Sequence, residues 1–339
     1  YLGESFEQWE LRCIKTEDGK DPCELFQSLK DDQGNAVAEF SIFGLPAGGK
    51  AAAGGTLMAP LETLLTANLT IQIDTAPAYG FGRSEEVVGK AIRGRRDQVV
   101  LATKCGLWWD DTRGSYFCEF DGKPLYRSLR PDTIRIELEN SLRRLGTDHI
   151  DLYQTHWPAT PPDQTPIAET MACLTDLQQQ GKIRAIGVCN VSPDELRDNC
   201  AHGAVATNQF RYGMLFRGPE KDLLPVCRER NVATLTYMSL EQGLLTGKVG
   251  MDRTFSAGEF RSNEAWNPWY KPENRRRVLD LLAAFGPLTQ KHACSLSQLV
   301  LAWTVAQPGV THALAGCRTA QQAQENARGG ERRLDAADL

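Results

Sequence analysis

Residues 71–80 read IQIDTAPAYG, a short apolar strand that ends on a carboxylate and presents a phenol five residues later. Apolar side chains alternate up to Asp74, and a turn that contains Pro77 then delivers Tyr79 and Gly80. An acidic residue after a strand is more often a helix cap than a catalytic group. The stretch therefore indicates an active site only if later strands bring partner side chains to the same edge.

A regular alternation of strands and helices follows this stretch. Short apolar strands are predicted at 71–74, 98–103, 149–155, 183–188, 205–210, 232–237 and 310–315. Amphipathic helical patterns lie between them at 84–94, 131–146, 166–181, 192–200, 221–231 and 295–307. Ser84, Asp132 and Ser192 stand where helix N-caps are expected. These repeats predict an α/β fold with a parallel sheet, and their number and the chain length favour a closed (β/α)8 TIM barrel.

Residues 1–70 have a different, β-rich pattern. Residues 1–45 alternate between apolar and polar side chains around a DQGN hairpin turn, residues 46–56 are a Gly/Ala-rich break, and residues 57–68 form a short helical pattern. We therefore expect two parts, a β-rich N-terminal segment over 1–70 and the barrel over 71–339.

The first β/α unit of such a barrel is missing from the repeats. Residues 39–49, EFSIFGLPAGG, followed by the helical pattern at 57–68, are expected to supply a surrogate first strand and helix. The alternative is a barrel with an incomplete wall, which would expose the edges of two strands. An open edge between the strand at 71–74 and the last strand would contradict the surrogate.

Composition and charge exclude several classes of function. The chain has 339 residues and a formal net charge of −5, which argues against a nucleic-acid-binding surface. Its apolar runs fall short of the roughly 18 residues that a membrane span needs. The five histidines and ten cysteines show no zinc-ligand spacing, so no metal site is predicted. We expect a small-molecule substrate rather than a nucleic acid or a membrane, and the oligomeric state stays open.

The cysteines point to two different compartments. Eight of the ten are scattered singly from Cys105 to Cys317, mostly within apolar runs, which is usual in a reducing compartment such as the cytoplasm. Cys13 and Cys23 instead flank a polar turn within a strand-like stretch. Their spacing suits a hairpin disulfide in an oxidising compartment, or two free thiols.

The predicted strand ends carry a set of side chains suited to proton transfer. The carboxyl ends of parallel barrel strands converge on one face, so Asp74, Tyr79, Lys104 and His156 are expected to meet there. A tyrosine with a pKa of about 10 is a poor acid near neutrality, but a nearby lysine lowers that pKa. The carboxylate holds the lysine charged, and the imidazole can orient a carbonyl oxygen. The set lacks an electron source and therefore calls for a hydride-donating cofactor.

From about residue 71 onward, a series of motifs resembles the aldo-keto reductase family. They are IDTAPAYGFGRSEEVVGKAI, VVLATK, LENSLRRLGTDHIDLYQTHWP, GKIRAIGVCN, TNQF, YMSLEQGLLTGK and GCRTAQQAQEN, in the family's order and spacing. The resemblance implies that Asp74, Tyr79, Lys104 and His156 form the catalytic tetrad, with Tyr79 as the general acid.

The same resemblance implies a binding site for NADP(H). Asn190 and Gln209 match the residues that hold the nicotinamide carboxamide, and Tyr237 matches the aromatic residue that stacks on its ring. The resemblance extends the cofactor site to Leu240 and Gly243 and to the segment for the adenosine and its 2′-phosphate, Gly316, Arg318, Gln322 and Asn326. The guanidinium fork of Arg318 suits a phosphate and favours NADP over NAD.

Residues 1–70 resemble another family, the invasion-associated locus B proteins. The resemblance rests on WELRC, CELFQSL, the DDQGN turn and AEFSIFGLPAGG. That family is exported to a periplasm, which implies a periplasmic origin for this segment and an oxidised pair of cysteines. The chain therefore resembles a fusion with its joint near LTIQIDTA.

The sequence thus predicts an NADP(H)-dependent oxidoreductase that reduces aldehydes or ketones, or oxidises sugar-like alcohols in reverse. Two alternatives stay open: a nucleotide-binding partner subunit with the same barrel, and an inactive hybrid that lacks a proper first barrel unit. The loops at 105–130 and 240–275 are expected to choose the substrate. Four tryptophans on loops near the cofactor face are expected to form a partly aromatic pocket, with core packing as the alternative: Trp108, Trp109, Trp157 and Trp266.

Overall fold

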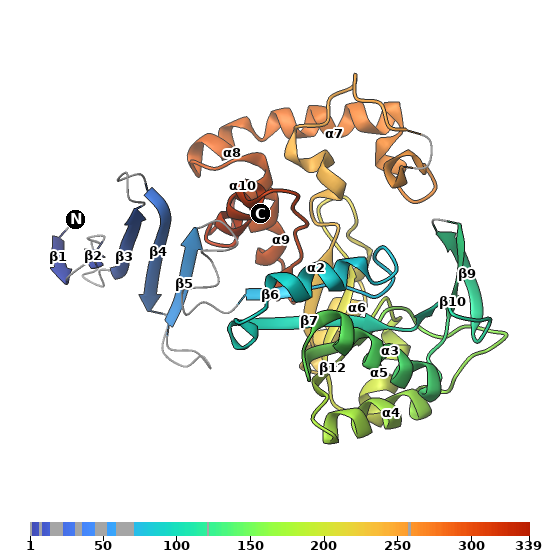
Figure 1. Cartoon of the computed structure of the whole chain (residues 1–339). Helices are drawn as coiled ribbons and strands as arrows, with labels where there is room; N and C mark the ends of the chain where they lie inside the picture. Colours follow the sequence, from blue (N-terminus) through green and yellow to red (C-terminus); the bar gives the residue numbers. More distant parts are fainter. Residues whose placement is uncertain are drawn as a thin grey trace.

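Seven parallel strands form the curled sheet at the centre of this computed structural model (Figure 1). The structure describes residues 71–339 except 121, 257 and 258, and in the N-terminal part it describes the backbone of five strands. The parallel strands lie side by side in the order β15 (His312–Ala313), β14 (Ala233–Tyr237), β13 (Val205–Arg211), β12 (Ile183–Cys189), β11 (Ile150–Thr155), β7 (Val99–Cys105) and β6 (Ile71–Asp74). The predicted α/β barrel-type fold is confirmed, and each predicted strand appears within two or three residues of its expected bounds.

Helices connect the strands and cover the sheet. They are α2 (Arg83–Ala91), α3 (Pro131–Leu145), α4 (Ile167–Gln179), α5 (Pro193–His202), α6 (Leu223–Glu229), α7 (Pro272–Ala284), α8 (Gly286–Lys291), α9 (Leu296–Ala306) and α10 (Ala320–Gly329). Short 3-10 helices lie at η1 (Arg96–Gln98), η2 (Gly218–Glu220), η3 (Glu241–Thr246), η4 (Phe260–Ser262) and η5 (Pro268–Tyr270). No helix in the described part of the chain is long and apolar enough to cross a membrane.

One of the three predicted helix caps is confirmed. Ser192 caps α5 in a capping box with Glu195. The prediction for Ser84 was wrong, because α2 begins after Gly82 and the Ser84 hydroxyl bonds instead to Thr75 Oγ1 at 2.8 Å. The prediction for Asp132 was also wrong: Pro131 already opens α3, so the carboxylate lies in the first turn.

The core between the sheet and helices α3 and α4 is apolar. Leu101 and Tyr153 point from the strands toward Ile134, Leu138 and Leu174 of the two helices, and all of them are fully buried. Burial of each such side chain stabilises the fold by about 1.5–3 kcal/mol. This packing holds the strand ends at fixed positions, so polar side chains placed there keep their mutual geometry.

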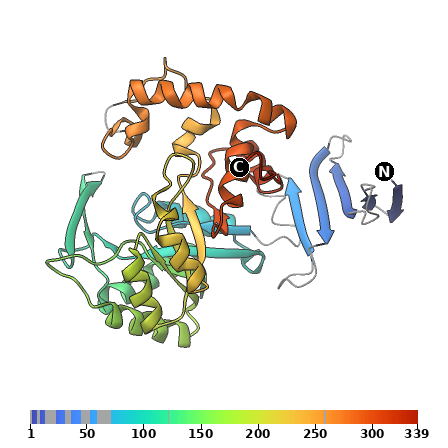
Figure 2. The same cartoon turned by 180° about the vertical axis from the view of Figure 1, so that it is seen from behind.

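The N-terminal strands form a separate antiparallel sheet, seen to one side of the parallel sheet in both views (Figures 1 and 2). Its order is β1 (Leu2–Phe6), β2 (Trp9–Cys13), β3 (Cys23–Lys30), β4 (Ala36–Gly44) and β5 (Ala53–Met58). The β2–β3 register sets Cys13 directly opposite Cys23, in the backbone position of a cross-strand pair.

The predicted surrogate first strand is not part of the parallel sheet. Strand β4 pairs with β3 on one side and β5 on the other, so its backbone groups are satisfied within the antiparallel sheet. Residues 53–56, predicted as part of a Gly/Ala-rich break, belong to β5, and residues 59–68 of the predicted helix lie outside the described residues. Among the described strands, β6 and β15 each have one neighbour, so the sheet is a curled half-barrel with an open edge.

A small antiparallel sheet stands beyond the end of β7 and was not predicted. It consists of β8 (Leu107–Trp108), β10 (Lys123–Arg127) and β9 (Ser115–Phe120), in that order (Figure 1). The last two strands form a hairpin, named here the β9–β10 hairpin. It occupies the segment between β7 and α3, where the sequence predicts a substrate-selecting loop.

Candidate functional site

A buried lysine–carboxylate pair lies at the end of the first two parallel strands. Lys104 is fully buried near the end of β7, and its Nζ donates hydrogen bonds to Asp74 Oδ1 and, at 3.0 Å, to the carbonyl oxygen of Thr75. Strand β6 runs parallel to β7 and brings Asp74 to this position. A buried ammonium is tolerated only with such a counter-charge.

The electrostatic surroundings keep Lys104 charged. Burial opposes its charge, but the phenol of Tyr79 and the carboxylate of Asp74 favour that charge, and together they raise the Lys104 pKa above its ordinary value. Lys104 is therefore a permanent cation at neutral pH. A permanent cation can stabilise a developing phenolate beside it.

The Tyr79 ring lies close to both this cation and an imidazole. Lys104 Nζ is 5.2 Å from the centroid of the Tyr79 ring, and the His156 ring meets Tyr79 edge-to-face at 5.7 Å between centroids. Tyr79 comes from the turn after β6 and is 45% exposed, so a ligand can reach its phenol. The structure therefore brings together the four side chains predicted from the ends of three consecutive strands.

His156 is held as a neutral imidazole. Burial and the charge of Lys104 both disfavour the imidazolium, and they lower the pKa of His156 well below its ordinary value. Its backbone N–H donates to the carbonyl oxygen of Cys105 at 2.8 Å, and the Asn190 amide donates to its carbonyl oxygen at 3.0 Å. A neutral ring carries one N–H donor and one acceptor, which suits it to orient a carbonyl oxygen.

We expect His156 to stay neutral down to pH values well below 6.5. A nuclear magnetic resonance titration of its ring should show no protonation between pH 8 and about 6. Because the unfolded chain takes up this proton near pH 6.5, the contribution of His156 to the free energy of unfolding is full above that pH. It falls as the pH decreases toward the folded-state pKa. A His156 resonance that titrates at an ordinary pKa would contradict this.

Two glutamine side chains fix the second oxygen of Asp74. Gln154 Nε2 and Gln209 Nε2 each donate to Asp74 Oδ2 at 2.9 Å, and Gln209 Nε2 also lies 3.2 Å from Gln154 Oε1. Sequence analysis missed Gln154, although it lies near the end of β11, two residues before His156. The strand register sets it opposite Lys104. The predicted cofactor residue Gln209 thus also contacts the tetrad.

A second polar pair joins Asn190, directly after β12, to Tyr237 at the end of β14. The Tyr237 hydroxyl donates to Asn190 Oδ1 at 2.7 Å, so both ends of the Asn190 amide are bound by protein. Asn190 has a left-handed backbone (φ 59°), which asparagine adopts more readily than most residues. Burial, the largest cause, raises the pKa of Tyr237 to about 12, so this phenol stays protonated.

The remaining predicted cofactor residues lie after β14 and β15. Leu240 precedes η3, in which Gly243 has φ 98°, and a Cβ at Gly243 or Gly316 would meet no atom within 4 Å. Gly316 and Arg318 precede α10, which carries Gln322 and Asn326. Lys248 Nζ lies 3.2 Å from Glu325 Oε2 and ties the two segments together.

These two segments suit a phosphate-containing ligand. The Arg318 side chain is exposed, and none of the carboxylates in the described residues lies within ion-pair distance of it. Gln322 Oε1 accepts a hydrogen bond from the Arg318 backbone N–H at 2.8 Å, which fixes the main chain there. Uncovered glycine backbone beside a free guanidinium fits a nucleotide with phosphate groups.

The predicted aromatic pocket divides into core and surface residues. Trp108 is 3% exposed and its indole N–H donates to Asp111 Oδ1 at 2.7 Å, so it is a core residue. Trp266 is 46% exposed. Trp109 packs on Phe81 at 5.4 Å between ring centroids, and Trp157 packs on Phe117 at 5.5 Å. Trp109 and Trp157 therefore remain candidates for lining a substrate pocket.

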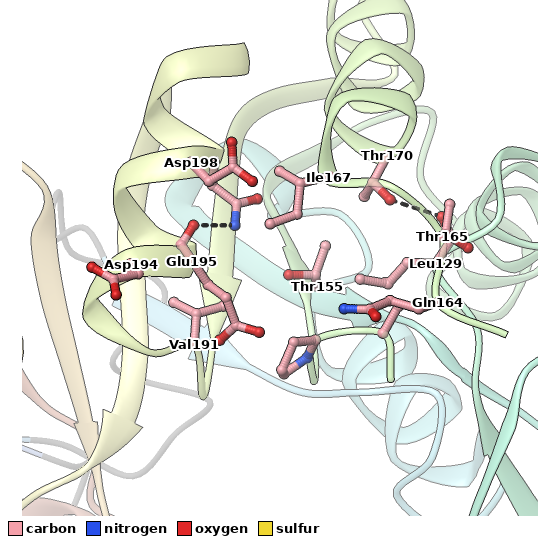
Figure 3. A pocket seen from close by; sticks show the side chains of 13 residues that line it. Leu129, Thr155, Gln164, Thr165, Ile167, Thr170, Val191, Asp194, Glu195 and Asp198 are labelled. Carbon is pink, nitrogen blue, oxygen red and sulfur yellow. Dashed lines mark hydrogen bonds between the residues drawn. The ribbon is translucent and has the colours of Figure 1, made fainter. Parts of the chain in front are cut away.

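A separate cavity of about 290 Å³ lies between α4 and α5 (Figure 3). Ile167 and Thr170 line it from α4, and Asp194, Glu195 and Asp198 line it from α5. None of the predicted site residues is among the side chains around it. The tetrad and this cavity are distinct features of the molecule.

Comparison with family profiles finds two matches along the chain. The Aldo/keto reductase family matches residues 50–339. The Invasion associated locus B (IalB) protein family matches residues 9–86. Both resemblances seen in the sequence are confirmed, and the two matches overlap across the joint.

Individual relatives agree with the longer match. The chain is 43% identical over 255 residues to the NADH-specific methylglyoxal reductase of Escherichia coli, covering 75% of this chain and 76% of the relative. It is 38% identical over 266 residues to the aldo-keto reductase YhdN of Bacillus subtilis, covering 78% and 75%.

Solved structures show the same likeness. The glycerol dehydrogenase AKR11B4 from Gluconobacter oxydans superposes with a TM-score of 0.72 and 36% identity, covering 82% of this chain and 80% of the other. An aldo/keto reductase from Klebsiella pneumoniae, solved with NADP and acetate, superposes with a TM-score of 0.58 and 29% identity, covering 79% and 77%.

Proposed function

The chain belongs to the aldo/keto reductase family, and we propose that it reduces aldehydes or ketones with NADP(H), using Tyr79 as the general acid. One observation carries this proposal. Lys104 Nζ contacts the Asp74 carboxylate and lies 5.2 Å from the Tyr79 ring, while His156 packs against the same ring. The oxidation of a sugar-like alcohol is the same chemistry in reverse.

Each of the four side chains has a distinct task in this proposal. When bound, the reduced cofactor supplies the hydride that reaches the carbonyl carbon. The Tyr79 hydroxyl gives its proton to the carbonyl oxygen, and the Lys104 charge stabilises the phenolate that remains. Asp74 keeps Lys104 in place. The neutral His156 donates its N–H to the same carbonyl oxygen and orients it toward Tyr79.

The residues proposed to hold the cofactor follow the order of the strands. Asn190 and Gln209 would bind the carboxamide of the nicotinamide ring, and Tyr237 would stack on the ring. The loop after β14 and the start of α10 would hold the rest of the nucleotide, through Leu240, Gly243, Gly316, Arg318, Gln322 and Asn326. The open backbone at the two glycines supports this proposal.

The unpaired guanidinium of Arg318 predicts a preference for NADP. The Escherichia coli relative is named as NADH-specific, whereas the Klebsiella pneumoniae structure contains NADP, so relatives differ in cofactor. We expect NADP to bind roughly 10-fold more tightly than NAD, and Arg318→Ala to remove that difference. Calorimetric titration with both cofactors measures it.

A matched control for this titration is Arg135→Ala, which removes an exposed arginine that is paired with Asp176. This variant should keep the wild-type ratio of the two affinities. Equal affinity of the wild-type protein for NAD and NADP would contradict the proposed role of Arg318. It would not affect the proposed reduction chemistry.

The enzyme proposal is tested by NADPH consumption with 4-nitrobenzaldehyde. We expect one molecule of alcohol for each NADPH consumed. If NADPH binds but no carbonyl compound is turned over, the enzyme proposal fails. The chain is then better interpreted as a nucleotide-binding partner subunit. If NADPH does not bind at all, the chain is an inactive hybrid.

We also propose that residues 1–70 and 71–339 are separate structural units. The strands of the first part pair only with each other among the described strands. The two family matches overlap over residues 50–86, around the proposed joint. The eight cysteines from Cys105 to Cys317 are free thiols. They support a reducing, cytoplasmic setting for the barrel, whereas the first part resembles a periplasmic family.

A further inference from the structure

Arg127 is a half-buried arginine that has no carboxylate partner among the described residues. It ends β10, and in the sheet it pairs with Ser115 of β9 and Leu107 of β8. Its Nε is buried without a hydrogen-bond acceptor, and burial lowers the pKa of this guanidinium from its ordinary value. A buried polar group without a partner costs free energy, so Arg127 is held in this position at a cost in stability.

Neighbouring arginines show that carboxylates are not scarce in this region. Arg113 binds both Asp111 and Asp132, with contacts of 2.8 and 2.7 Å. Arg130 binds Asp132 at 3.3 Å. Arg127 ends β10 of the small sheet and contacts none of these carboxylates. Arg127 therefore lacks a carboxylate partner because of its position, and not because carboxylates are absent from this region.

That position is next to the proposed catalytic residues. The Arg127 guanidinium carbon lies 4.3 Å from the centroid of the Phe117 ring and 4.8 Å from that of the Trp157 ring. Trp157 directly follows His156, and its ring packs against Phe117 at 5.5 Å. The two aromatic faces hold the guanidinium plane in place.

The β9–β10 hairpin also contacts the loop that carries Tyr79. Near its tip, Phe120 packs on Phe81 at 6.1 Å, and Lys123 Nζ lies 4.8 Å from the centroid of the Phe81 ring. Phe81 follows Tyr79 by two residues. The hairpin thus contacts the loops that carry Tyr79 and His156, whose rings meet each other.

We propose that Arg127 binds an anionic group of the carbonyl substrate, so that the preferred substrates are aldehydes or ketones bearing a carboxylate or phosphate. This inference rests on the proposed reductase function. The planar fork of a guanidinium forms paired hydrogen bonds with either anion. The aromatic pair would limit its movement, so little side-chain freedom is lost on binding.

The test compares two aldehydes, 4-carboxybenzaldehyde and its neutral methyl ester, which differ in charge and by one methyl group. For the wild-type protein we expect a kcat/KM ratio, acid over ester, of roughly 10- to 100-fold. Arg127→Met keeps an apolar stem against the two rings and removes the charge, so the ratio should fall to about 1. Arg127→Lys keeps the charge without the fork and should give an intermediate ratio.

Arg113→Met is the matched control, because Arg113 also lies over a tryptophan, Trp108 at 4.9 Å, but has its own carboxylates. This variant should keep the wild-type ratio. The proposal is overturned if Arg127→Met keeps the wild-type ratio, or if Arg113→Met lowers it equally.

A binding measurement separates this proposal from the enzymatic one. Calorimetric titration compares benzoate with benzamide, its neutral analogue of similar shape, on the wild-type and Arg127→Met proteins. We expect benzoate to bind the wild-type protein more tightly than benzamide, and the difference to disappear in the variant. If neither aldehyde is reduced, the reductase proposal fails and this titration alone decides on the anion site. Equal benzoate affinity for both proteins would refute the site.

Discussion

Replacing Tyr79 by phenylalanine is expected to lower kcat for the reduction of 4-nitrobenzaldehyde by roughly 10²- to 10⁴-fold, the usual range for loss of a general acid. The substitution removes one oxygen and leaves the ring that packs against His156 and lies beside Lys104. Steady-state kinetics with NADPH measures the effect. The affinity for NADPH should stay within about twofold, because the proposed cofactor contacts come from other strands.

The control for this variant is Tyr116→Phe. Tyr116 is an exposed phenol on the β9–β10 hairpin that contacts the ring of Tyr126 and has no part in the proposed chemistry. Its kcat should match the wild type. If Tyr79→Phe retains more than a tenth of wild-type turnover, Tyr79 is not the proton donor.

The meeting of the four proposed catalytic side chains could be predicted from the sequence because three of them stand at or directly after strand ends. Parallel strands of a barrel bring their carboxyl ends together whatever the length of the connections, so Asp74, Lys104 and His156 needed only correct strand assignment. Tyr79 follows on a short turn whose Gly80 (φ 66°) adopts a left-handed backbone at little cost. Local pattern and barrel geometry together were sufficient here.

Gln154 could not be assigned a role in the same way. It lies within a strand that reads as apolar, and a lone glutamine there carries no pattern of its own. Its importance comes from the register that sets it opposite Lys104 and from the carboxylate of Asp74, which is 80 residues away in sequence. A contact of this kind depends on the assembled sheet rather than on local periodicity.

For the N-terminal segment, the sequence predicts a strand but not the whole sheet to which it belongs. Strand β4 is predicted correctly as a strand, and the DQGN turn predicts its pairing with β3, which the structure shows. It does not take the surrogate place beside β6, because an alternating pattern specifies a half-buried strand and not every neighbour that it pairs with. Its pairing with β3 and β5 competes with any place beside β6. The β9–β10 hairpin is not predicted from the sequence, because its short strands lie between two strong strand–helix repeats and have the pattern of a loop.

Asp74→Asn is expected to lower both activity and stability. Lys104 is fully buried, and removal of its counter-charge leaves an uncompensated cation, which typically costs about 3–5 kcal/mol. In the wild-type protein the Lys104 pKa is raised, so the pair contributes its full stability at neutral pH and loses it only as the pH rises above about 10. Thermal unfolding and NADPH kinetics at pH 7 measure the two effects.

The double variant Asp74→Asn with Lys104→Met separates the two effects, because removing both charges is often nearly neutral for stability whereas removing one is not. It should unfold close to the wild-type temperature, with the Gln154 and Gln209 amides still able to donate to the asparagine oxygen that replaces Asp74 Oδ2. Its activity should remain low, since no cation is left to stabilise the Tyr79 phenolate. A double variant as unstable as Asp74→Asn would show that the carboxylate acts through the glutamines rather than through Lys104. Wild-type activity in the double variant would show that Lys104 has no part in the proposed chemistry.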